Sequence, residues 1–238
     1  MARLFLKFVE KAATKIKGKS YIIDQSLNGA DIFTFVFSRL ILLLRGVLAN
    51  FPVPFAKFSL VFLGRRVLFR SKSRITIGKF ATLSDYVSLD GLSVRGLQIG
   101  DRTSIGAFSM VQTTGVLTDI GVGFSIGKDC GMGPYCYVGA SGGVVIGDNV
   151  IMGQKVNFHS ENHNFKSPIK LIRDQGITRS GIRVGDNCWI GANVTILDGV
   201  EVGDGCVIAA GSVLRAGIYP KDSVLAGVPA KIVKSRLD

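Results

Sequence analysis

The chain has 238 residues, of which 47% are hydrophobic and 19% charged, and its formal net charge at pH 7 is +12. This length allows one or two domains, and the apolar share excludes a chain without a hydrophobic core. The charge is uneven, because residues 1–74 hold 14 Lys and Arg against 3 Asp and Glu, whereas residues 75–238 hold 15 against 14. The basic excess therefore belongs to the N-terminal segment.

Residues 1–74 are predicted to form a basic, apolar helical arm. They contain 10 of the 15 phenylalanines. The most apolar stretch, residues 32–48, includes Arg39 and Arg45, and 17 residues with two arginines fall short of a membrane span. A secretory signal is not expected either, because the apolar run begins late and no small-residue cleavage site is evident.

Two roles are open for this arm. It can cover the end of the adjoining domain and a neighbouring subunit, as the ends of repeat domains require. It can also contact an anionic membrane surface, which suits basic amphipathic segments with Phe and Leu on one face. Nucleic acid is not expected as a partner, because neither a known binding module nor an interleaved aromatic pattern is present.

From residue 75 onward the sequence repeats with a period of six. An aliphatic residue recurs at Ile77, Leu83, Leu89, Ile99, Ile105, Ile126, Met132, Val138, Ile146, Met152, Val184, Ile190, Ile196, Val202, Ile208 and Leu214. Four places later the residue is small or β-branched: Ala81, Val87, Ser93, Thr103, Ser109, Cys130, Cys136, Val150, Val156, Cys188, Val194, Val200, Cys206 and Ser212. Such a period is typical of a β-helix in which three short strands make a coil of about 18 residues.

The repeat predicts an all-β solenoid of about six coils over residues 75–223, followed by a C-terminal tail over 224–238. The coils begin near residues 77, 99, 126, 146, 184 and 202. The step from 146 to 184 is 38 residues, which is one coil plus an inserted loop over 159–181. A long insertion in a solenoid usually carries function.

All four cysteines stand at the small inward position of the repeat, where cysteine behaves as a small hydrophobe. Neither a metal-binding spacing nor a secreted disulfide pattern is present. The pattern favours a reducing, cytoplasmic location, with peripheral contact at the inner face of the cytoplasmic membrane if the arm binds lipid.

Both histidines, His159 and His163, lie at the start of the inserted loop, in the string FHSENHNF. Histidine is the usual general base for activating a hydroxyl or an amine near neutral pH. A catalytic zinc site with three histidines would need a third one, so no metal is expected.

The residues from His159 to Lys234 resemble the hexapeptide-repeat acyltransferases, which fold as left-handed parallel β-helices. The strings that carry the resemblance are HSENHNF, IRVGDNCWIGANVTILDGVEVGDGCVIAAGSVL and LAGVPAKIVK, and the repeat extends it over 75–234. The strings are similar to the O-acetyltransferase group that includes galactoside, maltose, nodulation-factor and capsular-polysaccharide acetyltransferases. The resemblance implies left-handed coils, a homotrimer with active sites between subunits, and direct transfer from acetyl-CoA without an acyl-enzyme.

The resemblance also implies roles for single residues. The family's catalytic base falls on His163, whereas His159 falls on a variable position. The implied coenzyme A contacts are Ala192, Ala210, Gly211, Arg215, Lys231 and Lys234. Gly191, beside Ala192, is a further candidate, because a residue without a side chain lets a ligand approach the backbone. One departure is the pair Arg215-Ala216 where the family often has Thr-Lys. Another is Gly133, which stands where galactoside acetyltransferases have an acceptor-pocket Asn.

Further candidates lie near these positions. Glu161 is the nearest carboxylate to His163 in the sequence and is a candidate to orient it, although a solvated loop charge is the alternative. Trp189 faces outward, where it would stack on coenzyme A or support the inserted loop.

The inserted loop also offers candidate substrate contacts. Asn162 and His159 would contact the acceptor, or Asn162 would shape the turn. Lys166 and Arg173 would meet an acidic sugar or a phosphate, or would be solvated loop charges.

The sequence therefore predicts an acetyl-CoA-dependent O-acetyltransferase. The expected acceptor is a sugar hydroxyl in a surface polysaccharide, lipopolysaccharide or lipid-linked glycan precursor. An amino-sugar N-acetyltransferase of the same fold and a non-enzymatic trimeric scaffold are the alternatives.

Overall fold

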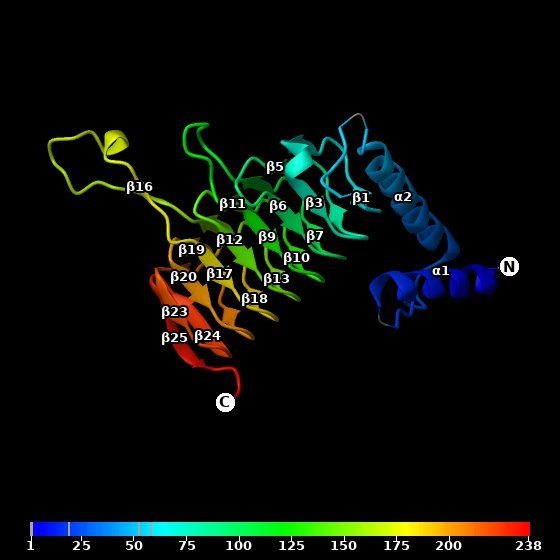
Figure 1. Cartoon of the computed structure of the whole chain (residues 1–238). Helices are drawn as coiled ribbons and strands as arrows, with labels where there is room; N and C mark the ends of the chain where they lie inside the picture. Colours follow the sequence, from blue (N-terminus) through cyan, green and yellow to red (C-terminus); the bar gives the residue numbers. More distant parts are fainter. Residues whose placement is uncertain (1, 19, 52, 58) are drawn as a thin grey trace.

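The computed structural model describes residues 2–18, 20–51, 53–57 and 59–238. Two helices, α1 (Ala2–Lys17) and α2 (Gly29–Leu48), precede a long stack of short strands (Figure 1). The stack is made of three parallel sheets, and successive strands of the chain visit the three sheets in turn. The chain is thus a parallel β-helix with two helices at its N-terminal end.

The strands fall into the three sheets as follows. The first sheet contains β1 (Phe62–Leu63), β4 (Thr82–Leu83), β7 (Ser104–Ile105), β10 (Gly131–Met132), β13 (Ile151–Met152), β18 (Trp189–Ile190), β21 (Val207–Ile208), β24 (Ser223–Gly227) and β25 (Ala230–Ser235). The second contains β2 (Leu68–Arg70), β5 (Ser88–Asp90), β8 (Met110–Gln112), β11 (Tyr137–Gly139), β14 (Asn157–His159), β19 (Thr195–Leu197) and β22 (Val213–Leu214). The third contains β3 (Ile75–Ile77), β6 (Leu97–Ile99), β9 (Phe124–Ile126), β12 (Val144–Ile146), β17 (Ile182–Val184), β20 (Val200–Val202) and β23 (Gly217–Tyr219).

The first coil begins earlier than the sequence predicted. The second and third sheets have seven strands each, so the stack has seven coils rather than about six, and β1 and β2 precede residue 75. Leu63 and Gly64 do start the repeat there, but the next inward position is the aromatic Phe69. A 3₁₀ turn over Lys72–Arg74 then lengthens the step to the next aliphatic position. These two departures conceal the first coil in the sequence.

The core consists of the inward residues that the period marks. In the first sheet Ile105, Met132 and Met152 pair in register on successive coils, and all three are buried. Each fully buried aliphatic side chain contributes about 1.5–3 kcal/mol relative to exposure to water. The four cysteines are buried and free, as expected for core residues.

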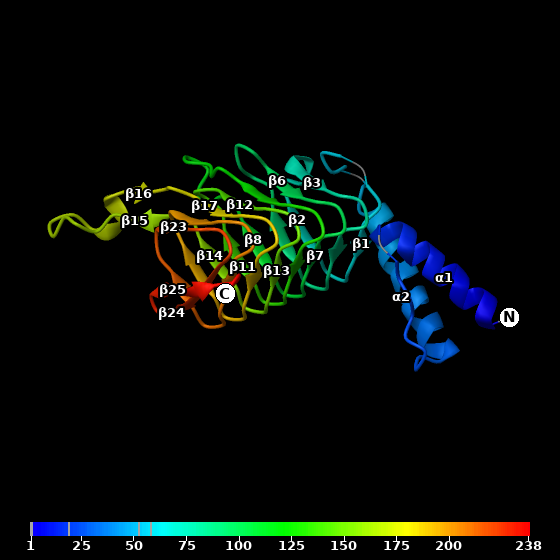
Figure 2. The same ribbon diagram turned by 90° about the horizontal axis from the view of Figure 1, so that it is seen from below.

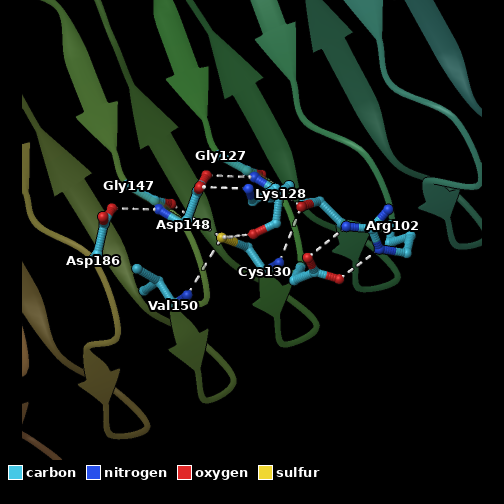
Figure 3. A network of polar contacts seen from close by, with 10 residues as sticks. Arg102, Gly127, Lys128, Cys130, Gly147, Asp148, Val150 and Asp186 are labelled. Atoms are coloured by element: carbon cyan, nitrogen blue, oxygen red, sulfur yellow. Dashed lines mark hydrogen bonds and ion pairs between the residues drawn. The ribbon is translucent and has the colours of Figure 1, made fainter. Parts of the chain in front are cut away.

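The Gly that often follows the aliphatic residue has a packing reason, which Figure 3 shows. At the corner between the third and first sheets, Asp148 Oδ1 accepts the backbone N–H of Lys128 at 2.9 Å, and Asp186 Oδ1 accepts that of Asp148 at 2.7 Å. A methyl group on Gly127 or Gly147 would overlap these carboxylate oxygens. The Gly-Asp pair of the repeat therefore links several coils to the next one along the stack.

Helix α2 packs on the first coil. Gly46 lies against Val61 with no room for a methyl group, Ile32 is buried, and Arg39 Nη1 donates to Thr82 Oγ1 at 3.3 Å. Among the described residues no helix combines the length and apolar character needed to cross a membrane. Helix α2, packed on β1, covers the N-terminal end of the stack.

An inserted loop leaves the stack near its other end (Figures 1 and 2). It follows β14, which ends at His159, and returns to β17, which begins at Ile182. It contains an antiparallel ribbon of β15 (Asn162–His163) and β16 (Ile177–Thr178), and a 3₁₀ turn over Ile172–Asp174. Past the loop, the predicted tail over 224–238 forms most of a hairpin, in which β24 and β25 pair antiparallel.

Candidate active site

The base of the inserted loop is attached to the stack by one buried carboxylate. Asp198, which follows β19, is only 6% exposed. Its oxygens accept the backbone N–H groups of Ser180, at 2.9 and 3.0 Å, and Gly181, at 2.7 Å, on the returning strand. Its Oδ2 also accepts the side-chain amide of Asn162 at 3.2 Å, on the outgoing strand. One side chain therefore fixes both ends of the loop, and these bonds satisfy a charge that would be costly to bury alone.

The bond to Asn162 determines the direction of His163. The two residues are neighbours in β15, where successive side chains point to opposite faces. Because Asn162 points toward Asp198, His163 points to the opposite face of the ribbon, where it is exposed. His163 is also held in the backbone by its antiparallel pairing with Ile177. The imidazole is thus presented to solvent from an anchored strand.

The same face of the ribbon carries an ion-pair cluster. Arg179 Nε lies 3.1 Å from Glu161 Oε2, and Arg179 Nη1 lies 3.0 Å from Asp119 Oδ1. Asp119 belongs to a smaller loop over 113–122, between β8 and β9, so Arg179 joins the two loops. Glu161 was a candidate to orient His163, with a solvated loop charge as the alternative, and the structure places its carboxylate on Arg179.

His159 lies on a different surface from His163. It ends β14 on the outer face of the second sheet, and its ring is 5.6 Å from that of Tyr137. The Tyr137 ring lies across Gly139, which has no side chain in the way. Burial raises the pKa of Tyr137, and the nearby charge of Glu161 raises it further. The structure therefore groups His159 with Tyr137 on the sheet next to the loop.

The predicted donor positions lie at another corner of the coil. Gly191, Ala192, Ala210 and Gly211 are at the corner between the first and second sheets. There Gly211 N–H donates to Ala192 O at 2.8 Å, and a methyl group on Gly191 would overlap the backbone of Ala210. Ala210 and Gly211 are exposed, and Gly211 has open space at its Cα. An extended ligand can therefore approach the backbone closely at this corner.

The other predicted donor contacts are spread over the surface. Lys231 and Lys234 are exposed on β25, at the edge of the first sheet. Arg215 is exposed after β22, at the corner that carries the inserted loop. Trp189 is 58% exposed on the outer face of the first sheet, and the inserted loop leaves from a different corner. Within one subunit Trp189 therefore lies away from the base of the inserted loop.

The outer part of the inserted loop is organised by Gln175. Its side-chain amide donates to the carbonyls of Ser167 and Lys170, both at 2.9 Å, and its Oε1 accepts the N–H of Ser167. Lys166 and Arg173, the predicted substrate contacts, are exposed on this part of the loop. The loop is therefore a folded element that presents basic side chains.

Two hollows open on the surface away from His163. One, of about 250 Å³, lies between Arg70, Asp90 and the smaller loop. The other, of about 450 Å³, lies on the third sheet beside Arg183 and Glu201. Within the described residues no group of three or more His, Cys, Asp or Glu side chains could hold a metal ion.

Sequence inspection did not select Asp198, Arg179 or Asp119. A signal for the smaller loop was present, because the step from Ile99 to Ile126 is 27 residues, longer than one coil. Nothing in the local sequence of Asp198 indicates its partners, which stand 17, 18 and 36 residues away.

Two family models match the coils. Residues 123–153 match the hexapeptide repeat of succinyl-transferase, and residues 181–216 match the bacterial transferase hexapeptide of six repeats. These stretches of the chain therefore contain hexapeptide repeats. The predicted fold, a left-handed parallel β-helix, is confirmed by these repeats and by the three stacked parallel sheets.

Two curated proteins similar to this chain are acetyltransferases by name. A probable acetyltransferase of Mycobacterium tuberculosis is 32% identical over 39% of this chain and 31% of its own length. The putative lipopolysaccharide biosynthesis O-acetyl transferase WbbJ of Escherichia coli K12 is 36% identical over 42% of this chain and 54% of its own length. The predicted resemblance to sugar acetyltransferases is confirmed, although the matches span about a third and about half of these relatives.

Solved structures share the fold. A putative acetyltransferase of Bacillus cereus has a TM-score of 0.52 at 21% identity, covering 71% of this chain and 83% of its own. The N-acyltransferase AntD of Bacillus cereus, solved with dTDP-4-amino-4,6-dideoxyglucose and coenzyme A, has a TM-score of 0.50 at 17% identity. That match covers 80% of this chain and 88% of AntD. At these identities the similarity establishes the β-helix alone.

Proposed function

We propose that the protein is an acetyl-CoA-dependent O-acetyltransferase that acts on a sugar hydroxyl of a surface polysaccharide, lipopolysaccharide or lipid-linked glycan precursor. The observation that carries this proposal is His163, an exposed imidazole on a ribbon anchored by the buried Asp198. The O-acetyl transferase name of the Escherichia coli relative supports hydroxyl over amine as the nucleophile.

In the proposed mechanism His163 is the general base. Acetyl-CoA supplies an activated acyl group when it is bound. His163 accepts the proton of the acceptor hydroxyl as the oxygen attacks the thioester carbonyl, so a C–O bond forms and the C–S bond breaks. The proton then passes from His163 to the leaving sulfur, which regenerates the neutral base. Backbone N–H groups at a coil corner are the proposed donors to the developing oxyanion.

The donor fits the corner between the first and second sheets. Ala210 and Gly211 are exposed there, with open space at Gly211 for a pantetheine chain. Lys231 and Lys234 on β25 offer cations of the right sign for the phosphates of coenzyme A.

We propose that the active site is completed in a homotrimer. Within one chain, the base and most of the donor positions occupy different corners, on either side of the second sheet. The inserted loop also exposes large apolar side chains, at Phe165, Ile169, Leu171 and Ile172. A neighbouring subunit would cover these side chains and bring its donor corner to His163. Light scattering after size exclusion tests the trimer.

The enzymatic proposal is tested with acetyl-CoA and a panel of acceptors. The panel contains neutral sugars, amino sugars and glycans extracted from the cell surface, and the products are examined by mass spectrometry. Acetylation of amines alone would show an N-acetyltransferase. A failure to bind coenzyme A by calorimetry would favour a non-enzymatic scaffold.

His163→Ala is expected to lower turnover by about 10²–10⁴-fold, because general-base catalysis typically contributes that much. His159→Ala is the comparison variant, since it removes the other histidine, a candidate acceptor contact, and leaves the proposed base in place. Turnover of His163→Ala close to that of the unmodified protein would refute the assignment of the base.

We also propose that residues 1–74 contact an anionic membrane surface in addition to covering the first coil. This contact would bring the enzyme near a lipid-linked acceptor. Its support is the excess of 14 Lys and Arg over 3 Asp and Glu in this segment. Flotation with anionic vesicles tests the contact.

A further inference from the structure

Helix α2 carries a continuous apolar stripe that faces away from the stack. The exposed members are Phe33, Phe37, Leu40, Leu44, Leu48 and, just beyond the helix, Phe51. Their spacing of three or four residues places them on one side of the helix. Each is between 54% and 74% exposed, and neither an acidic nor a basic residue interrupts the stripe.

The opposite side of α2 is already occupied. Ile32 and Gly46 are buried there, and Arg39 reaches the second coil through Thr82 in β4. Arg39 also lies over the ring of Phe62 at 5.2 Å. The orientation of α2 is therefore set by the stack, and the apolar stripe remains free within one chain.

The neighbouring helix α1 carries positive charge. Lys7, Lys11 and Lys15 form an exposed row on α1, since they are spaced by four residues. The acids of residues 1–74 are committed to local backbone bonds. Glu10 accepts the N–H of Ile23, and Asp31 accepts that of Asn28 at the start of α2. The third, Asp24, accepts the N–H of Ser26.

We propose that this apolar stripe lies in the interface of an anionic lipid bilayer, with α2 parallel to the membrane plane and the α1 lysines on the headgroups. This deepens the membrane contact proposed for residues 1–74 and does not depend on acetyl transfer. Twenty residues give α2 a length of about 30 Å, but α2 is held flat against the first coil and so cannot insert end-on. A peripheral helix with this combination of faces partitions at the surface of a membrane.

Charge favours lipid over a second copy of the chain as the occupant. Residues 1–74 carry a net charge of +11, so two copies meeting stripe to stripe would bring like charges together. Anionic headgroups neutralise the same charges, and each Lys or Arg near such a surface contributes about 1 kcal/mol.

The test is co-sedimentation of the full chain with vesicles of phosphatidylcholine, with and without phosphatidylglycerol. The unmodified protein is expected to bind the anionic vesicles and to be released by high salt.

The double variant Phe37→Asp with Leu44→Asp is expected to weaken partitioning into the vesicles about tenfold or more, because two side chains lose their burial in lipid. Lys7→Glu with Lys11→Glu is expected to lower binding and its dependence on salt. Leu237→Asp, which changes an exposed apolar residue at the other end of the chain, is the matched control.

Each other outcome is informative. If the unmodified protein ignores anionic vesicles, both the membrane contact and its stripe are refuted. If it binds and the Phe37/Leu44 variant binds equally, the stripe is refuted and the wider contact stands. A third outcome is that no vesicle binding is seen, and that light scattering shows an assembly of the unmodified protein which the Phe37/Leu44 variant does not form. The stripe would then be a contact between copies of the chain. Circular dichroism and the melting temperature, compared with Leu237→Asp, show whether the variant is folded. Acetyl transfer to a water-soluble acceptor is measured separately, so its failure is not confused with loss of lipid binding.

Discussion

Aspartate side chains accept backbone N–H groups at two corners of the coil, but the two sets of hydrogen bonds hold different parts of the molecule together. At the corner between the third and first sheets, Asp148 and Asp186 each accept a backbone N–H of the preceding coil (Figure 3). At the corner between the second and third sheets, Asp198 accepts two backbone N–H groups and an amide from the inserted loop. The first arrangement recurs from coil to coil, whereas the bridge made by Asp198 joins the ends of one insertion.

The comparison separates the scaffold from the site. A bond that recurs on successive coils distributes its stabilisation along the stack, as expected for a solenoid in which each repeat contacts its neighbours. The bonds of Asp198 hold a single strand, and that strand carries His163. Loss of the first kind of bond is expected to lower stability, whereas loss of the second is expected to lower activity.

Among variants at these two corners and the adjoining loops, the largest effect is expected for Asp198→Ala. The variant removes the acceptor for Ser180, Gly181 and Asn162, so the strand that directs His163 is released. Turnover is expected to fall about 10–100-fold with the KM for acetyl-CoA unchanged, because small misplacements of a catalytic group are costly. Amide exchange over residues 160–181 is expected to speed up, while exchange in the coils is unchanged.

Asp198→Asn provides the rescue for this experiment. It keeps one carbonyl oxygen as an acceptor, so its turnover is expected to lie between those of Asp198→Ala and the unmodified protein. Unchanged turnover in Asp198→Ala, together with faster exchange over the loop, would separate the anchor from catalysis and refute the positioning role.

The next effect concerns the scaffold corner alone. Gly147→Ala places a methyl group against Asp186 Oδ1, and the coils must separate to admit it. The free energy of unfolding is expected to fall by about 1–3 kcal/mol, measured by denaturant titration. Gly29→Ala is the control, because nothing lies within 4 Å of the added methyl group. Equal stability of the two variants would show that the Gly-Asp contact is not needed.

The repeat itself was predictable because it is local. An aliphatic residue and a small residue four places later determine which side chains face inward, and Ile105, Met132 and Met152 are stacked accordingly. The inserted loop was predictable for the same reason, as an interruption of the period. The first coil was not, because Phe69 and the turn over Lys72–Arg74 depart from the local pattern.

The side-chain contacts that anchor the inserted loop could not be predicted from the local sequence. Arg179 meets Asp119 across 60 positions, and Asp198 meets Asn162 across 36. Such pairs form only after the coils stack and the loop folds back on them. The nearest carboxylate to His163 in sequence, Glu161, was a poor guide, because the ribbon pairs it with Arg179.

A smaller effect is expected when one bond of the repeating ladder is removed. Asp148→Ala leaves the N–H of Lys128 without its acceptor, at a corner that solvent partly reaches. The expected loss is about 0.5–1.5 kcal/mol of stability, seen as a lower denaturant midpoint at constant slope, with turnover unchanged. A loss of turnover as large as that of Asp198→Ala would contradict the view that one corner serves stability and the other serves activity.

The smallest effect is expected for Arg179→Gln, which cuts the link between the two loops and leaves Asp198 in place. Its ion pairs with Glu161 and Asp119 are partly exposed, since the two carboxylate side chains are 35% and 54% accessible. Pairs of this kind contribute about 0.2–1 kcal/mol each and weaken with salt. Turnover is therefore expected to fall no more than about fivefold at low salt, and the difference from the unmodified protein is expected to shrink as salt is added. A defect that persists at high salt would mean that Arg179 acts on the substrate or on His163 directly, and the loop corner would then hold a second functional cation rather than a second anchor.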